Sequence, residues 1–271
     1  MEVRPPLLDG AVPPLRWAAP SFVMAGTVAE NVRFTKGQVP EMALCLFETA
    51  GCLAYTEADL PAAGERLGPG GAPMRFHAHL PVDLPWEEGA SPRERGGRAC
   101  ETALAVLARV ADLEPCLCVL HPPCLGPDTD AALLDAFLER WTMRSAVPVL
   151  LENIGGAPLF DLPRSLFGPG AYGVCLDAGH LMGYHQEPLM DTDLPGLVRL
   201  MHWSAPGGGD RHRPLTEFTA AERQMALRVV RATPPEATQL IEVFNWEGVR
   251  ASLPVLEALW AEGHGDSWRE R

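Results

Sequence analysis

The sequence has no long apolar run and no excess of basic residues. No apolar stretch reaches the roughly 20 residues of a membrane-spanning helix, and the opening MEVRPPLLDGAVPP is Pro-rich and acidic, unlike a signal peptide. We therefore expect a cytoplasmic protein without a membrane partner. Lys and Arg number 22 against 35 Asp and Glu, a net charge of −13 that argues against nucleic acid as a partner. An anionic small molecule is still a possible substrate, because bound divalent ions can make the electrostatic potential of a site positive in an acidic protein.

Paired cysteines and phosphate-binding motifs are also absent. The seven cysteines are an odd number, and Cys116 with Cys118 forms C-x-C rather than the C-x-x-C of a zinc knuckle. The glycines at 207–209 allow a close approach of backbone to a ligand, but no Gly-Lys-Ser/Thr follows them. No repeat or low-complexity block divides the 271 residues, a length that suits one barrel domain over 1–271 with short flexible ends.

Short β-rich runs alternate with longer amphipathic stretches, which is typical of a parallel α/β fold. The expected strands are SFVM (21–24), EMALCLFE to 48, MRFHAH to 79, CLCVLH to 121, VLLE to 152, YGVCLD to 177, LVRLMH to 202 and LIE to 242. Helices are predicted at about 98–111 and 130–145, over TAAERQMALRVVRA and over 247–263, and the polar tail GDSWRER is expected to fray. Eight such strands predict a single (β/α)8 TIM barrel.

Seven of these runs end at a carboxylate or an imidazole. In a parallel barrel the C-terminal ends of the strands share one rim, where the loops leaving them converge. Five of the eight histidines and four carboxylates occupy strand-end or first-loop positions, some of them in the motifs Asp-x-x-His and Asp-Arg-His. The nine candidate metal ligands are His79, His121, Glu152, Asp177, His180, His202, Asp210, His212 and Glu242.

Each candidate ligand also has an ordinary structural interpretation. Asp177 could cap the following helix, Glu152 could pair with an arginine, and His121 before two prolines could be a satisfied turn histidine. Nine independent structural roles are a less economical explanation of this pattern than one polynuclear metal site. We therefore interpret the nine residues as ligands of such a site. Of the other histidines, His77 could line the same face as His79, whereas those at 185 and 264 are predicted at the surface.

The ligand pattern resembles that of the xylose-isomerase-like barrels, and more closely that of their apurinic endonuclease branch. That branch uses a strand-end histidine, a second histidine, a glutamate, Asp-x-x-His, another histidine, Asp-Arg-His and a final glutamate, and no position is missing here. The segments AENVRFTKGQVPEMALCLFET, HLPVDLP, CLDAGHLMGY and HRPL further resemble the cobamide-remodelling phosphodiesterases of the CbiR type over most of the chain. The resemblance implies a cobamide as substrate, cut at its nucleotide loop into cobinamide phosphate and a riboside.

The same resemblance implies how the ligands divide among ions. The first ion would take His79, His121 and Glu152, the second Glu152 as a bridge with Asp177, His202 and Glu242, and the third His180, Asp210 and His212. Two or three divalent ions are the expected cofactors, and these nitrogen and oxygen donors suit zinc and also Mn²⁺, Fe²⁺ or Co²⁺. The carboxylates of Glu152, Asp177 and Glu242 would bridge the ions and position a hydroxide for in-line attack on phosphorus.

Four further residues are candidates for substrate binding. Glu48 ends its run on the same rim, and Arg211 and Arg213 could steady phosphate oxygens or lie at the surface as ordinary arginines. The loop at 81–97 carries Trp86 and is interpreted as either a substrate lid or a flexible insertion.

Three other functions compete with phosphodiester hydrolysis. A sugar isomerase or epimerase on the same barrel needs chiefly the set Glu152, Asp177, His202 and Glu242, and the five extra ligands favour hydrolysis. Repair of abasic DNA would share all nine ligands, but the basic surface and an evident aromatic-and-arginine wedge are missing. A corrinoid-binding or metal-storage module would leave the open metal positions without a purpose.

Overall fold

Eight parallel strands pair in chain order and close into a barrel in the computed structural model, which describes residues 16–208 and 211–265. The strands are β1 (Trp17–Pro20), β2 (Glu41–Cys45), β3 (Arg75–His79), β4 (Cys118–Leu120), β5 (Val149–Glu152), β6 (Gly173–Asp177), β7 (Val198–Trp203) and β8 (Thr238–Ile241). The helices are α1 (Val28–Thr35), α2 (Thr49–Leu53), α3 (Pro92–Arg109), α4 (Pro127–Thr142), α5 (Ala178–Gly183), α6 (Ala220–Ala232) and α7 (Trp246–His264). The predicted TIM barrel is confirmed.

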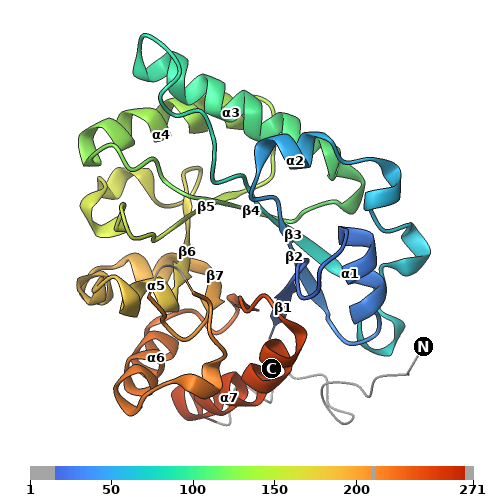
Figure 1. Cartoon of the computed structure of the whole chain (residues 1–271). Coiled ribbons are helices and arrows are strands. Elements are labelled where there is room, and N and C mark those ends of the chain that lie inside the picture. Colours follow the sequence, from blue (N-terminus) through green and yellow to red (C-terminus); the bar gives the residue numbers. More distant parts are fainter. Residues whose placement is uncertain (1–15, 209–210, 266–271) are drawn as a thin grey trace.

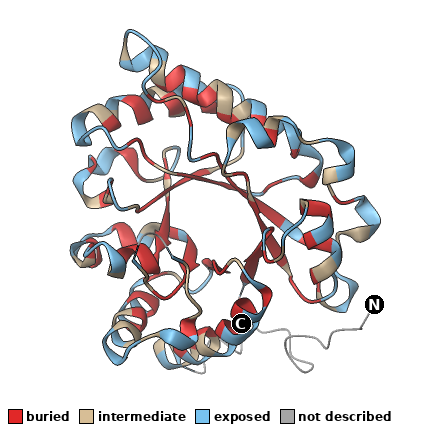
Figure 2. Ribbon diagram, in the orientation of Figure 1, coloured by how far each residue is buried: buried red, intermediate tan, exposed pale blue. Residues whose placement is uncertain are grey.

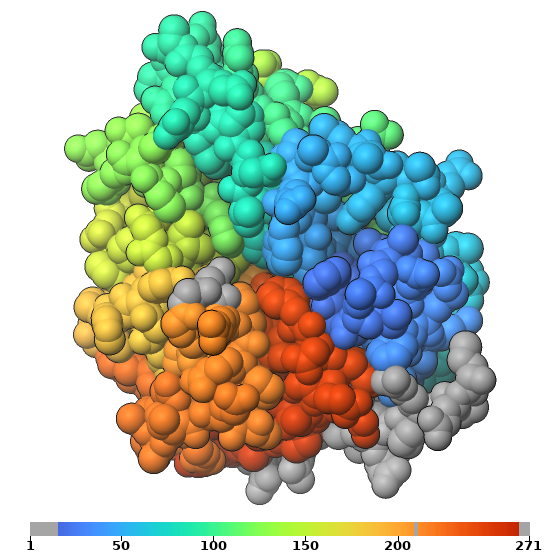
Figure 3. Space-filling view, in the orientation of Figure 1, coloured from blue at the N-terminus to red at the C-terminus, as the bar shows by residue number. Residues whose placement is uncertain are grey.

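Figure 1 looks along the barrel, with the strands as an inner ring and the helices around them. Strand β1 pairs with both β2 and β8, so the two ends of the described chain meet where the ring closes. Figure 3 shows this closure as blue N-terminal atoms lying against red C-terminal atoms. Among the described residues, no helix is both long enough and apolar enough to cross a membrane.

The strands are buried on both faces, which explains their nearly continuous apolar sequences (Figure 2). One face packs against the helices and contributes to a large apolar core. The other face fills the barrel interior with a smaller cluster: Ala18, Ala43, Leu117, Val119, Leu150, Cys175, Leu200 and Leu240. Because side chains alternate along a strand, the residue two positions beyond a member of this cluster also points inward.

The first strand lies earlier than the sequence pattern predicted. SFVM (21–24) is not a strand; β1 is the preceding WAAP, in which Ala18 is small enough for the crowded barrel interior and Ala19 lies in the larger core on the other face. Phe22 instead follows the strand with half of its surface exposed.

Two predicted helices begin earlier than expected. Helix α3 starts at Pro92, because the Ser91 side chain accepts from the backbone N–H of Glu94 and proline suits the first helical turn. Helix α4 likewise starts at Pro127 rather than near 130. Residues 92–97 therefore belong to a helix and not to the loop predicted at 81–97. The start of α6 is confirmed, since Thr219 and Glu222 form the expected capping box.

The last helix also follows its prediction closely. Helix α7 spans Trp246–His264, one residue beyond each end of the predicted 247–263. The polar tail after Gly265 lies outside the described residues, as does the Pro-rich start of the chain.

Candidate metal centre

The strand ends place the predicted ligands on one rim, pointing inward. Five of them stand two positions beyond an apolar residue of the interior cluster, such as Val119 before His121, Leu150 before Glu152 and Cys175 before Asp177. Described ligands lie at or next to the C-terminal end of β3, β4, β5, β6, β7 and β8: His79, His121, Glu152, Asp177, His202 and Glu242. Asp210 lies outside the described residues.

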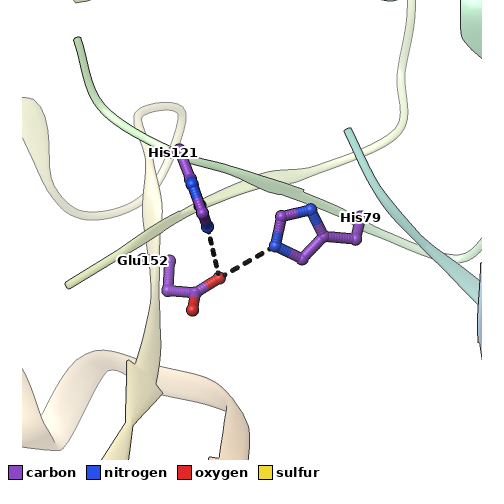
Figure 4. A group of neighbouring side chains, drawn as sticks. All are labelled: His79, His121 and Glu152. Carbon is purple, nitrogen blue, oxygen red and sulfur yellow. Dashed lines mark hydrogen bonds and ion pairs between the residues drawn. The ribbon is translucent and has the colours of Figure 1, made fainter. Parts of the chain in front are cut away.

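Two imidazoles converge on one oxygen of Glu152. Its Oε2 is 3.2 Å from Nε2 of His79 and 3.4 Å from Nε2 of His121, and Figure 4 shows both rings directed at this oxygen. Nδ1 of His79 lies 2.9 Å from the carbonyl oxygen of Leu80, to which it donates. That hydrogen bond leaves the lone pair on Nε2, the tautomer that a metal ligand needs.

The other oxygen of Glu152 belongs to a second group. Oε1 lies 3.3 Å from Nδ1 of His202, which is also 3.0 Å from Oε2 of Glu242 and 3.9 Å from Oδ2 of Asp177. One ligand atom from each of these four buried residues fits within 4.8 Å of the others. Glu152 is thus shared by two groups that could each hold a metal ion, as the bridging role predicts.

The two described members of the third predicted group are also neighbours. The rings of His180 and His212 have centroids 5.9 Å apart, and Nδ1 of His212 is 3.6 Å from Oε2 of Glu242. Nδ1 of His180 donates to the carbonyl of Asn153 at 2.9 Å, which leaves the lone pair on its Nε2. The third ion position therefore stays a prediction that adjoins the second group.

Asp177 caps a helix and also faces the other candidate ligands. Its Oδ1 accepts from the backbone N–H of His180 at 2.5 Å and caps α5, while Oδ2 faces the second ligand group. Gly179 makes this geometry possible, because a Cβ there would lie only 2.3 Å from Oγ of Ser204 and 3.2 Å from Oδ1 of Asp177. The motif CLDAGH thus requires glycine between its two candidate ligands.

Burial and charge in the second group suit a bound cation. Oδ2 of Asp177 is buried without a hydrogen bond from the described part of the chain, and the buried Oε2 of Glu242 has only imidazole nitrogens near it, at 3.0 Å in His202 and 3.6 Å in His212. Leaving buried carboxylate oxygens without donors is costly, and a divalent ion removes that cost. The donors are imidazole nitrogens and carboxylate oxygens, the set that zinc and similar ions prefer, so these residues fit a metal centre.

The pKa shifts show how strongly these groups interact without a metal. Burial alone would raise the pKa of the Glu152 carboxyl, but the neighbouring His202 and His121 hold that pKa well below its usual range. The pKa of His202 is raised well above its usual range, because Cys175, Glu242 and Glu152 outweigh the effect of its burial. Burial raises the pKa of Asp177 to about 6. A proton on His202 therefore occupies the place in the charge balance that a metal ion would take.

Asn153 was not assigned a role from the sequence, although it follows Glu152 directly. Its Oδ1 accepts from the backbone N–H of Asp177 at 2.7 Å, and its Nδ2 donates to the Asp177 carbonyl at 3.0 Å. The backbone carbonyl of Asn153 also accepts from Nδ1 of His180. These contacts fix Glu152, Asp177 and His180 relative to one another. An asparagine directly after a strand-end ligand was the only sequence signal for it.

Two phenylalanines that the sequence pattern did not single out enclose the ligands. Phe47 and Phe244 pack edge to face with each other, their ring centroids 5.9 Å apart. Phe47 also contacts the ring of His79, and Phe244 that of His212, each with centroids 4.9 Å apart. These rings cover the candidate ligands His79 and His212 from one side.

The candidate substrate residues lie in different surroundings. Glu48 is not at a strand end, because β2 stops at Cys45; it is exposed and precedes the first turn of α2. Trp86 is buried against Phe137, with ring centroids 5.6 Å apart, although it also lines a hollow beside His121. Trp86 is anchored in the core, which makes it a wall of that hollow rather than a mobile lid.

Arg211, just before the motif HRPL, and Arg213, within it, differ in their contacts. Arg213 donates to the carbonyl of Pro206 and pairs with Glu217 at 3.0 Å, so its guanidinium is occupied by neighbours in its own chain. Arg211 is exposed beside His212. Of the two, Arg211 is the one whose side chain lies at the surface near the ligands.

The remaining histidines follow their predictions in part. His77 points into the barrel below His79, and its Nδ1 lies 2.8 Å from Oε1 of the buried Glu41. His185 is exposed, as predicted. His264 is half-buried, with its ring 4.5 Å from that of Trp260, so the surface prediction holds only partly for it.

Comparison with solved structures finds the same barrel in proteins of distant sequence. Endonuclease IV from Thermus thermophilus superposes with a TM-score of 0.64 at 19% identity, covering 91% of this chain and 99% of the other. The IOLI protein with a bound zinc atom gives 0.61 at 10% identity, covering 93% and 100%. A D-tagatose 3-epimerase-like protein gives 0.57 at 13% identity, covering 90% and 97%.

No protein-family model and no curated protein matches the sequence. The likeness to solved structures extends over nine-tenths of the chain in each case. Together with the closed ring of eight parallel strands, it shows that the chain has the same TIM-barrel fold as these proteins.

Proposed function

We propose that this protein is a metal-dependent phosphodiesterase. The observation that carries the proposal is the position of Glu152, whose two oxygens face two different groups of ligands. A carboxylate placed in this way joins two neighbouring ion positions, and pairs of ions are typical of enzymes that cleave phosphate esters. Bound ions would supply a deprotonated water at neutral pH and stabilise the charge that develops on the phosphate and leaving oxygens.

The protein's own residues prepare this site in specific ways. Leu80 and Asn153 accept from Nδ1 of His79 and of His180, so each ring keeps a fixed tautomer and orientation. Asp177 uses one oxygen to hold α5 and keeps the other toward the second group. Cys175 lies beside His202 but is fully buried, and burial raises the pKa of its thiol to about 12, so hydrolysis by water rather than by a side-chain nucleophile is the chemistry that these residues support.

We propose a cobamide as the substrate, on the strength of the resemblance carried by AENVRF, HLPVDLP and CLDAGHLMGY. Cleavage of its nucleotide loop would give cobinamide phosphate and a riboside. If the reaction is hydrolysis at phosphorus, a reaction in ¹⁸O-labelled water places the label on cobinamide phosphate and not on the riboside, as mass spectrometry would show. Label in the riboside, or no cleavage with Zn²⁺, Mn²⁺, Fe²⁺ or Co²⁺, would contradict the proposal.

Sugar isomerisation is the second candidate function, because a single ion held by one of the two ligand groups is sufficient for it. Glu152, Asp177, His202 and Glu242 form a complete four-ligand site with both glutamates beside the same position. A single bound ion with two adjacent carboxylates could move protons on a sugar. Against this candidate, His79 and His121 would have no purpose in a one-ion isomerase, although they converge on Glu152.

A further inference from the structure

A hollow of about 950 Å³ lies at the end of the barrel opposite the candidate metal centre. Its lining comes from residues that precede or begin every strand except β2. The candidate metal ligands stand at the other ends of these strands, and none of them lines this hollow. Its volume is typical of a site for a small molecule.

Three arginines line this hollow, which we call the arginine hollow. Arg16 precedes β1, Arg75 begins β3, and Arg199 lies near the start of β7. Among the described residues of the lining, Glu236 is the only acidic one. The whole chain has 22 basic and 35 acidic residues, so this local excess of positive charge runs against its composition. Such an excess attracts anions.

Arg75 is held by neighbours within the chain. Its Nη1 lies 3.5 Å from Oε2 of the buried Glu41, and its Nη2 donates to Sγ of Cys116 at 3.5 Å. Arg16 is also close enough to Glu41 to interact with its charge. A single buried carboxylate therefore faces two of the three guanidinium groups and cannot neutralise both.

The arginine hollow keeps a net positive charge when all of these groups are counted. Three arginines face two carboxylates, Glu41 and Glu236. Neither Arg16 nor Arg199 forms an ion pair or a side-chain hydrogen bond with another described residue. Their guanidinium groups are therefore available to phosphate or carboxylate oxygens, which arginine binds through paired hydrogen bonds.

The walls between the arginines are largely apolar. Leu138, Val147 and Leu197 are half-buried and line the hollow. The ring of Trp141 is buried in the same wall, with its Nε1 donating to the carbonyl of Val147 at 2.8 Å. Apolar walls with a few charged groups are typical of sites that bind small organic molecules.

We propose that the arginine hollow is a second ligand site, which binds a small organic oxyanion: a phosphate or carboxylate group on an apolar body. Arg16 and Arg199 hold the anionic group, while Arg75 stays paired with Glu41. The apolar walls contact the body of the ligand. This site is independent of the proposed function, because it shares no residue with the candidate metal centre.

Two exposed cysteines allow a direct test. Cys116 lines the arginine hollow, whereas Cys124 lies at the opposite end of the barrel in the hollow beside His121. The metal-loaded protein is treated with the uncharged reagent iodoacetamide at increasing concentrations of phenylphosphonate, and peptide mass spectrometry follows the alkylation of each cysteine. Phenylphosphonate should slow the alkylation of Cys116 until the effect saturates. Benzyl alcohol, an uncharged molecule with the same ring, should not.

The variants Arg16→Gln and Arg199→Gln should each raise the phenylphosphonate concentration for half-protection of Cys116 about tenfold, because each removes a charge-assisted hydrogen bond to the anion. Arg109→Gln is the matched control, since Arg109 is exposed at the end of α3 and outside the hollow, and it should change nothing. Absence of protection, equal protection by benzyl alcohol, or unchanged protection in both variants would overturn the proposal. Protection confined to Cys124 would also overturn it, because the anion would then bind at the metal centre.

Discussion

Oε1 of Glu152 lies 3.3 Å from Nδ1 of His202, while its other oxygen faces the imidazoles of His79, at the end of β3, and His121, directly after β4. One carboxylate thus links ligand groups that come from opposite parts of the barrel. If both groups hold ions, the removal of this one charge disturbs two ion positions at once, which a carboxylate of a single-ion site would not do.

The Glu152→Gln variant should therefore lose more than one metal ion per chain. The amide keeps the shape of the side chain but lacks the charge and one of the two acceptor oxygens. Elemental analysis of purified protein would measure the loss, and circular dichroism would check the fold. Glu48→Gln is the matched control, because Glu48 is exposed in a loop and its replacement should change no metal content. Loss of one ion or none would mean that the bridge is misassigned.

His212→Ala should reduce hydrolysis strongly and leave the barrel folded. His212 lies at the edge of the second group, 3.6 Å from Glu242, and would contribute to the third ion. Loss of an ion that stabilises developing charge is worth several kcal/mol, or about 100-fold or more in turnover. The rate should be compared with that of His185→Ala, an exposed histidine whose loss has no predicted effect. Turnover equal in both variants would exclude a catalytic third ion held by His212.

Replacements of Asp177 should separate its two roles. Asn is as good an N-cap as Asp and carries no buried charge, so Asp177→Asn should be at least as stable without metal but bind metal much more weakly. Asp177→Ala should lose metal binding and, in addition, about 1 kcal/mol of the free energy of unfolding. Chelator-treated samples of both variants, unfolded with urea, would measure the difference. Equal metal affinity in Asp177→Asn and the unmodified protein would show that Oδ2 is no ligand.

The buried Glu41 predicts a specific pH dependence of stability. Burial raises its pKa, but the hydrogen bond and charge of His77, together with Arg75, hold that pKa below its usual range. A carboxyl whose pKa is lower in the folded state stabilises the protein above its unfolded pKa of about 4.3, and this contribution disappears as pH falls through the folded pKa.

Glu41→Gln should therefore be less stable than the unmodified protein by about 1–3 kcal/mol at pH 7, and by less in acid. Urea unfolding of both proteins at pH 7 and near pH 3 would measure the two differences. A gap that stays constant, or that grows as the solution is acidified, would contradict the charged pairing of Glu41 with His77.

Much of the fold and of the candidate site could be predicted because successive side chains of a strand point to opposite faces. His121, Glu152 and Asp177 each stand two residues beyond an interior apolar residue, so a carboxylate or imidazole at the end of an apolar run points into the barrel mouth. The position of β1 could not be predicted in the same way. WAAP resembles a loop by composition, and it forms a strand through its pairing with β2 and β8, where the small Ala18 fits the barrel interior.

Contacts between distant segments account for what the sequence pattern missed. Trp86 is buried because α4 brings Phe137 against it, and Arg213 is occupied because the chain folds back so that Ala205 pairs with it. Asn153 gained its role from β6, which places the backbone of Asp177 within reach of its amide. Phe137 and Asp177 are far in sequence from Trp86 and Asn153, and Ala205 reaches Arg213 only because the chain folds back, so local pattern could not reveal these contacts.

Metal content measured together with product formation tests the central claim most directly. The purified protein, analysed for bound elements, is incubated separately with a complete cobamide, a ketose and an abasic DNA duplex, and the products are followed by mass. The proposed function predicts two or three divalent ions per chain and a riboside released from the cobamide alone. A single ion with interconversion of the ketose, or cleavage confined to the DNA, would contradict it.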